Sequence, residues 1–142
     1  MIAEPLELIR KGFPRTWYYP EWRLITWFPR GIFNAAFVNQ ILEFAQMEER
    51  IQEAPFDRYT DFSGLTDIRL KVDHVFQIAR RRRTVRQPVK SAFVADKPVS
   101  FVLAQMYEHL MEHAVIDVRA FRHRKAAAEW LGVPMKVLEP PS

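Results

Sequence analysis

Apolar residues recur along this chain with two different spacings, which predict strands alternating with helices. In "RTWYYPEWRLITWF" two short runs of aromatic and β-branched residues flank Pro20 and Glu21, a pattern typical of an antiparallel hairpin. Alternation places the aromatic side chains of this hairpin on both faces of the sheet. The surplus aromatics then line an apolar pocket or a partner interface, or they lie in the core beneath an N-terminal arm at residues 1–14.

Helical spacing follows the hairpin. After Gly31, apolar residues repeat at intervals of three and four up to Glu53, and Pro55 ends the pattern. We expect a long helix here, with Asn34 as its N-cap.

The rest of the chain repeats this alternation. Strands are expected at "DRYTDF", with Tyr59 and Phe62 in the core, at "VKSAFVA" and at "AVIDVRAF". Helices are expected at about 67–82, at 98 to about 113 and over "HRKAAAEWLG". The side chains expected to face inward from these helices are Ile68, Val72, Val75, Phe76, Ala79, Val99, Val102, Leu103, Met106, Leu110, Ala127, Trp130 and Leu131.

The order ββαβαβαβα predicts an α/β fold. Parallel strands joined by right-handed crossovers, with one antiparallel edge strand from the hairpin, give a mixed sheet of about five strands and four helices. The length of 142 residues fits a single domain, 1–142, with a frayed tail at 133–142.

Composition narrows the class of protein. The chain has no cysteine, which excludes disulfides, thiolate zinc sites and cysteine nucleophiles. No apolar run approaches the roughly 20 residues of a membrane span, and Glu4 and Glu7 interrupt the N-terminal apolar residues, unlike a signal peptide. We therefore expect a cytoplasmic protein.

Positive charge is concentrated in one acid-free stretch. Removing Arg80–Arg83, Arg86 and Lys90 from the formal net charge of +4 leaves −2, so the rest of the chain is not basic. A helix C-terminus favours cations and accounts for part of the run. The surplus suggests that Arg81, Arg82, Arg83 and Arg86 contact an anionic lipid surface. Nucleic acid is not expected, because aromatic residues for base stacking are missing around the run.

Three stretches carry a family resemblance. They are Gly31 after the aromatic hairpin, "YTDFSGLTDI", and the closing segment "VRAFRHRKAAAEWLG". Together they resemble the anti-sigma-factor-antagonist (STAS) fold, and more closely its SpoIIAA-like relatives, which are distantly similar to Sec14-type lipid-transfer domains. The resemblance implies a strand-to-helix corner at Asp61, Ser63, Gly64 and Thr66. It also places Leu70 where phosphoregulated members carry the acceptor serine, and leucine has no hydroxyl to phosphorylate.

Other candidate chemistry is sparse. Ser63 or Thr66 is expected to cap the following helix. His109 and His113 are spaced to share one helix face, but no third ligand is in view, so no metal is expected. The four glycines are scattered and no nucleophile elbow is present, so neither a cofactor nor an enzymatic activity is expected.

Two hypotheses for function follow, with an enzyme as a third. One is a non-enzymatic STAS-like interaction or regulatory module that docks a partner protein or a second copy of itself. The other is a carrier of an apolar ligand or lipid, peripherally associated with anionic membrane, that holds its ligand between helices and sheet. Such a pocket is expected at Phe37, Phe44, Phe101 and Met106.

Overall fold

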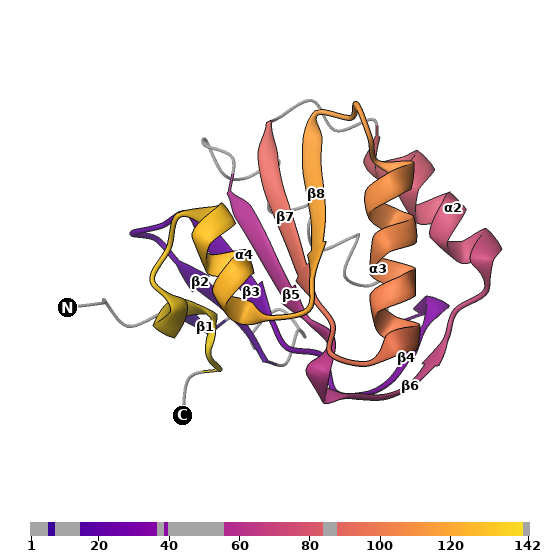
Figure 1. The fold of residues 1–142 in the computed structure, drawn as a ribbon, viewed down its shortest axis with the longest axis horizontal. Coiled ribbons are helices and arrows are strands. Elements are labelled where there is room, and N and C mark those ends of the chain that lie inside the picture. Colours follow the sequence, from indigo (N-terminus) through magenta and orange to yellow (C-terminus); the bar gives the residue numbers. More distant parts are fainter. Residues whose placement is uncertain (1–5, 8–14, 37–38, 40–55, 84–87, 141–142) are drawn as a thin grey trace.

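A mixed sheet is the centre of the fold in the computed structural model, which describes residues 6–7, 15–36, 39, 56–83 and 88–140. Its strand order is β1-β2-β3-β5-β7-β8 (Figure 1). The strands are β1 Leu6–Glu7, β2 Thr16–Tyr19, β3 Leu24–Trp27, β5 Asp57–Asp61, β7 Val89–Val94 and β8 Ile116–Phe121. Strands β1 and β2 pair antiparallel, as do β2 and β3, whereas β3, β5, β7 and β8 run parallel. The predicted mixed α/β sheet is confirmed, with the short β1 added outside β2.

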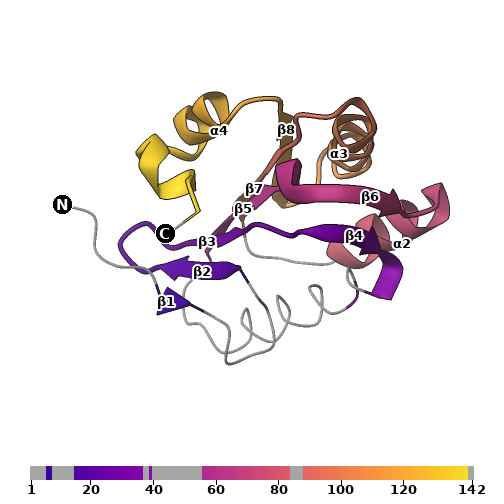
Figure 2. The same ribbon diagram turned by 90° about the horizontal axis from the view of Figure 1, so that it is seen from below.

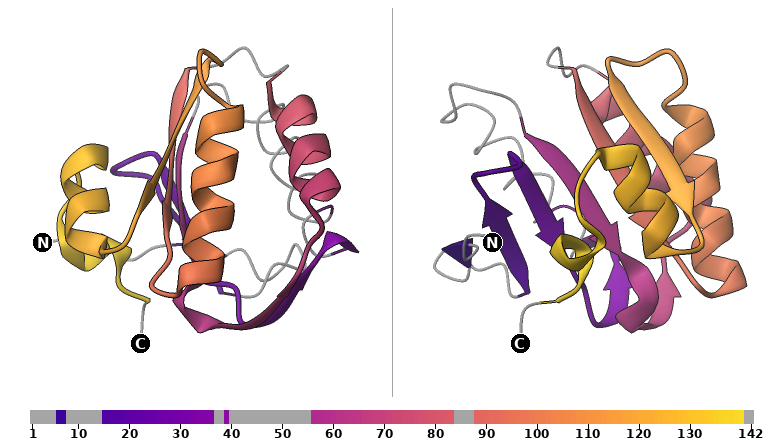
Figure 3. Two further views of the ribbon diagram at one scale, coloured as in Figure 1. Left: turned by 45° about the vertical axis from the view of Figure 1, so that its right-hand side comes forward. Right: turned by 60° about the vertical axis from the view of Figure 1, so that its left-hand side comes forward.

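Helices cover both faces of this sheet. Helix α4 (Arg124–Leu131) lies on one face, and α2 (Val72–Arg82) and α3 (Pro98–Leu110) lie on the other (Figure 3). The helix expected from Asn34 to Glu53 falls mostly outside the described residues, so a total of four helices stays a prediction. Within the described part of the chain, no helix is long and apolar enough to cross a membrane.

A second, two-stranded sheet was not expected. Strand β4 (Gly31–Asn34) pairs in parallel with β6 (Leu65–Arg69), beside the ends of β3 and β5 (Figure 2). The predicted helix start at Asp67 is therefore wrong, because α2 begins at Val72. Pairing with β4 satisfies the backbone groups of β6 in an extended form, and this tertiary contact overrides the local helical spacing.

The core on the α4 face includes the C-terminal segment. Gly132 takes a left-handed conformation (φ 73°) that ends α4, and a 3-10 helix, η3, follows at Met135–Leu138. Val137 and Leu138 are completely buried against the sheet and α4. The prediction of a frayed tail is thus wrong for residues 133–138, because the buried side chains of Val137 and Leu138 complete this core.

On the opposite face, α2 and α3 are rotated about their own axes relative to the expected orientation, so different side chains point toward the sheet. Val75 and Ala79 are buried as predicted, and α3 meets the sheet through the small residues Ser100 and Ala104. Small side chains let a helix lie close to a sheet, which turns its larger neighbours outward. Four side chains expected inside are exposed: Val72 and Phe76 on α2, and Val99 and Val102 on α3.

Candidate functional site

The predicted corner joins two strands. Asp61 ends β5, Ser63 and Gly64 lie in a short 3-10 helix, η2 (Phe62–Gly64), and Thr66 is in β6. Neither Ser63 nor Thr66 caps α2, whose N-cap position is Lys71, so that interpretation is wrong. Asp61 instead caps the short helix η2, because its side chain accepts a hydrogen bond from the backbone N–H of Ser63.

Gly64 allows a close approach between η2 and the segment before β4. A Cβ at this position would lie 3.0 Å from the carbonyl oxygen of Pro29 and 3.2 Å from Cγ of Arg30. The glycine is therefore explained by backbone packing at this turn.

Asp61 is the centre of a buried polar network. Its Oδ2 accepts hydrogen bonds from the Tyr59 hydroxyl at 2.8 Å and from Nε of Arg124 at 2.9 Å, and its Oδ1 accepts the Ser63 N–H at 2.9 Å. Burial by itself raises the pKa of Asp61, but the hydrogen bonds from Ser63, Tyr59 and Arg124 outweigh burial and hold the pKa below its ordinary value. Burial and the neighbouring Asp61 carboxylate raise the pKa of Tyr59. The network ties the start of α4 to the end of β5, which is a structural role.

Leu70, at the place that the resemblance assigns to the phosphoacceptor, lies half-buried between β6 and α2 and lines a cavity. An apolar wall residue suits this position. That the site receives no phosphate stays a prediction from its side-chain chemistry.

The arginine segment does not form one solvent-facing patch. Arg81 is exposed, but Arg82 is only 2% exposed and lines the cavity. Arg86 lies outside the described residues. The predicted contact with an anionic surface is therefore wrong for Arg82, because the phase of α2 turns this side chain inward.

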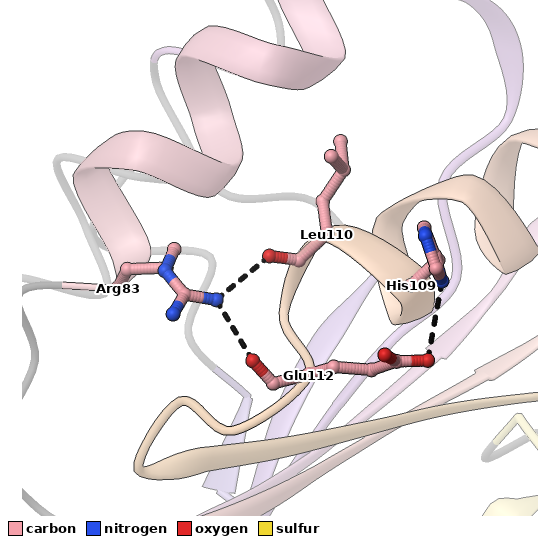
Figure 4. Close-up of polar contacts among 4 residues, drawn as sticks. All are labelled: Arg83, His109, Leu110 and Glu112. Carbon is pink, nitrogen blue, oxygen red and sulfur yellow. Dashed lines mark hydrogen bonds and ion pairs between the residues drawn. The ribbon is translucent and has the colours of Figure 1, made fainter.

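Arg83 is exposed but engaged with the end of α3. Its Nη1 donates to the carbonyl oxygens of Leu110 and Glu112, each at 2.9 Å (Figure 4). His109 Nδ1 lies 3.1 Å from Oε1 of Glu112, and His113 sits in the turn after α3 with φ 65°. The two histidines therefore do not lie on consecutive turns of one helix, because His109 is in α3 and His113 follows its end. The described residues contain no group of three side chains suited to a metal, and the absence of a metal stays a prediction.

A cavity of about 140 Å³ lies between the sheet and helices α2 and α3. The sheet contributes Trp27, Arg58, Thr60, Ser91 and Phe93. The helices contribute Val75, Ile78, Arg82, Leu103, Ala104 and Tyr107. The remaining described wall is formed by Phe33, Phe62, Ile68 and Leu70.

One wall of the cavity is a continuous row of aromatic rings. Ring centroids are 6.0 Å apart for Trp27 and Phe33, 5.2 Å for Phe33 and Phe62, 5.6 Å for Phe62 and Phe93, and 5.5 Å for Phe93 and Tyr107. These separations are those of favourable aromatic pairs. The row makes this wall apolar and aromatic along its length.

The cavity lies between helices and sheet, as the carrier hypothesis requires, but its residues differ from those predicted. Phe37 and Phe44 are outside the described residues. Phe101 and Met106 do not line the cavity, so these two assignments are wrong. Phe101 instead lies beneath the guanidinium of Arg122, 4.2 Å from its ring centroid.

Sequence reasoning missed Arg58, and the strand pattern held a signal for it. A parallel strand covered on both faces is normally apolar throughout. In β5, however, Arg58 and Thr60 alternate with the buried Tyr59, and Ser91 of β7 is in register with Arg58. Polar residues at adjacent positions on a helix-covered face indicate a space that is not filled by ordinary core packing.

Comparison of the chain with protein-family models, with curated proteins and with solved structures gives no match. The resemblance to SpoIIAA-like proteins therefore stays a prediction that rests on the three stretches of sequence named above.

Proposed function

We propose that this domain binds a small apolar ligand in the cavity between the sheet and helices α2 and α3. The observation that carries this proposal is the apolar, aromatic wall around a space of about 140 Å³. A dry cavity of about 150 Å³ lined by apolar side chains is large enough to bind benzene. A concave apolar space with few polar groups is also the usual form of a small-molecule site.

The proposed binding is not catalytic. Among the described lining residues there is no carboxylate, histidine, lysine or cysteine to act as a general base or nucleophile. The buried carboxylate of Asp61 is not a lining residue, and its hydrogen bonds are made with Tyr59, Ser63 and Arg124. A carrier or a ligand-sensing module fits these groups better than an enzyme.

Filling the cavity tests the proposal. Ala104 is 3% exposed and lines the cavity, whereas the next residue, Gln105, is exposed on the same helix. With hexan-1-ol as a neutral probe, calorimetry should show saturable binding to the wild type and at least tenfold weaker binding to Ala104→Leu. The matched variant Gln105→Leu should bind as the wild type does. Equal binding by the two variants, with both folded by circular dichroism, would place the probe outside the cavity.

The exposed apolar residues on α2 and α3 favour a second candidate, a protein-interaction module. Val72 and Phe76 are four residues apart on α2, and Val99 and Val102 are three apart on α3, so each pair shares one side of its helix. Both helices cover the same face of the sheet and contact each other. We propose a second copy of this chain as the partner. Light scattering should then give a dimer mass for the wild type and a monomer mass for Phe76→Ser, and a monomeric wild type would contradict this candidate.

A further inference from the structure

Two buried hydroxyl groups line the cavity without a hydrogen-bond partner. Thr60 of β5 is 7% exposed and Ser91 of β7 is 5% exposed, and both residues line the cavity on the sheet face covered by α2 and α3. Neither hydroxyl makes a hydrogen bond with a described residue. The other lining residues with polar side-chain atoms already have further interactions: Trp27, Arg58, Arg82 and Tyr107. Buried polar groups are normally hydrogen-bonded, so two unpaired hydroxyls in an apolar cavity point to a partner supplied by a ligand.

The positions of the two hydroxyls allow them to share one partner. Along the parallel strands β5 and β7, Arg58 is in register with Ser91, and Thr60 is in register with Phe93. Thr60 and Ser91 are therefore diagonal neighbours on the same face of adjacent strands. A single hydroxyl group placed between them can donate a hydrogen bond to one and accept a hydrogen bond from the other.

We propose that the ligand is a small neutral phenol, with its hydroxyl between Thr60 and Ser91 and its ring along the aromatic row. This inference rests on the proposed function, and it adds the chemical class of the ligand. Phe93 belongs to the aromatic row and is in register with Thr60, so the hydroxyl groups and the aromatic wall are adjacent. Aromatic rings favour offset or edge-on contacts with a further ring. A phenol also stays protonated at pH 7, because its pKa is about 10.

The size and the unpaired hydroxyls of the cavity together determine its selectivity. A space of about 140 Å³ suits one ring the size of benzene. An entirely apolar cavity would bind benzene better than phenol, because phenol loses its hydrogen bonds to water on entry. With Thr60 and Ser91 in the wall, these hydrogen bonds are replaced, whereas benzene leaves both hydroxyls unpaired. Phenol and benzene are therefore matched probes that differ only in the hydroxyl group.

The experiment compares the two probes by NMR titration of the protein at pH 7. The wild type should bind phenol at least as tightly as benzene. Thr60→Val and Ser91→Ala each remove one hydroxyl and should weaken phenol binding about fivefold, the value of one net hydrogen bond, while benzene affinity stays within about twofold. The matched variant Thr66→Val removes an exposed hydroxyl from β6 and should change neither affinity.

Thermal unfolding without a probe gives a second readout. Thr60→Val keeps the shape of the side chain and removes a hydroxyl that has no partner within the fold, so the unfolding midpoint should equal or exceed that of the wild type. A clearly lower midpoint would mean that the fold already uses this hydroxyl, and it would count against the proposed site.

The binding results separate this inference from the proposed function. Wild-type binding of benzene about tenfold tighter than that of phenol would refute the hydroxyl site and leave apolar binding intact. Failure of both probes to bind would refute both proposals. Unchanged phenol affinity in either Thr60→Val or Ser91→Ala would overturn the placement of the ligand hydroxyl between them. Equal losses in Thr60→Val and Thr66→Val would place phenol on the surface.

Discussion

Replacing Arg124 by Met should destabilise the fold by about 3 kcal/mol. The substitution keeps most of the aliphatic length but removes the donor that lies 2.9 Å from Oδ2 of Asp61. Asp61 is 1% exposed and would keep only the Tyr59 hydroxyl and the Ser63 N–H as partners. Removing one member of a buried ion pair costs about 3–5 kcal/mol, and the partial exposure of Arg124 places the effect at the lower end.

An exposed pair with the same atoms provides the control. Nε of Arg69 lies 2.9 Å from Oδ2 of Asp67, but both side chains are at least half exposed, so Arg69→Met should change stability by less than about 0.5 kcal/mol. Urea unfolding followed by tryptophan fluorescence measures both variants. Adding Asp61→Asn to Arg124→Met should recover part of the loss, since no carboxylate then lacks its cation. Equal effects of the two arginine substitutions would refute the assignment of the energy to burial.

Three further predictions concern stability. Leu138→Ala should lower the free energy of urea unfolding by about 3 kcal/mol because the side chain is completely buried. Met135→Ala alters an exposed residue of the same 3-10 helix and should lower it by less than about 0.5 kcal/mol. Similar losses in the two variants would mean that η3 is not part of the core. Trp130→Ala should cost about 2–3 kcal/mol, below the range for full burial, because the half-buried ring still packs on the core; a change below about 1 kcal/mol would contradict that contact. The pKa of Asp61 is lowered in the folded state, so the ionised carboxylate stabilises the fold above the unfolded-state pKa of about 3.9, and this stabilisation is lost as the pH falls through the folded-state pKa. The midpoint of thermal unfolding should therefore fall less between pH 5 and pH 2 in Asp61→Asn than in the wild type. Parallel pH curves for the two proteins would contradict this.

Patterns local to one element predicted the sheet well. Alternating apolar residues and turn residues correctly predicted the hairpin around Pro20, the burial of Tyr59 and the strands β7 and β8. These signals lie within each element and do not depend on which other element packs against it. The stop signal at Gly132 was also correct, because a left-handed residue ends a helix for local steric reasons.

Features that depend on distant partners were not predictable in this way. Residues 65–69 are extended because β4 pairs with them, and Leu138 is buried because the chain turns back across the sheet. Helical periodicity locates an apolar face but not its final rotation, which is why Arg82 is inside and Phe76 is outside. The cavity arises from that rotation together with Arg58 and Thr60, whose polar character on a covered strand was visible in the sequence.

The most direct test of ligand binding is to locate hexan-1-ol on the protein by methyl-resolved NMR. Contacts between the probe and the methyl groups of Ile78, Val75 and Leu103, which line the cavity, are the predicted result. Contacts confined to the exposed methyl groups of Val72 and Val99 would place the probe on the surface and contradict the account.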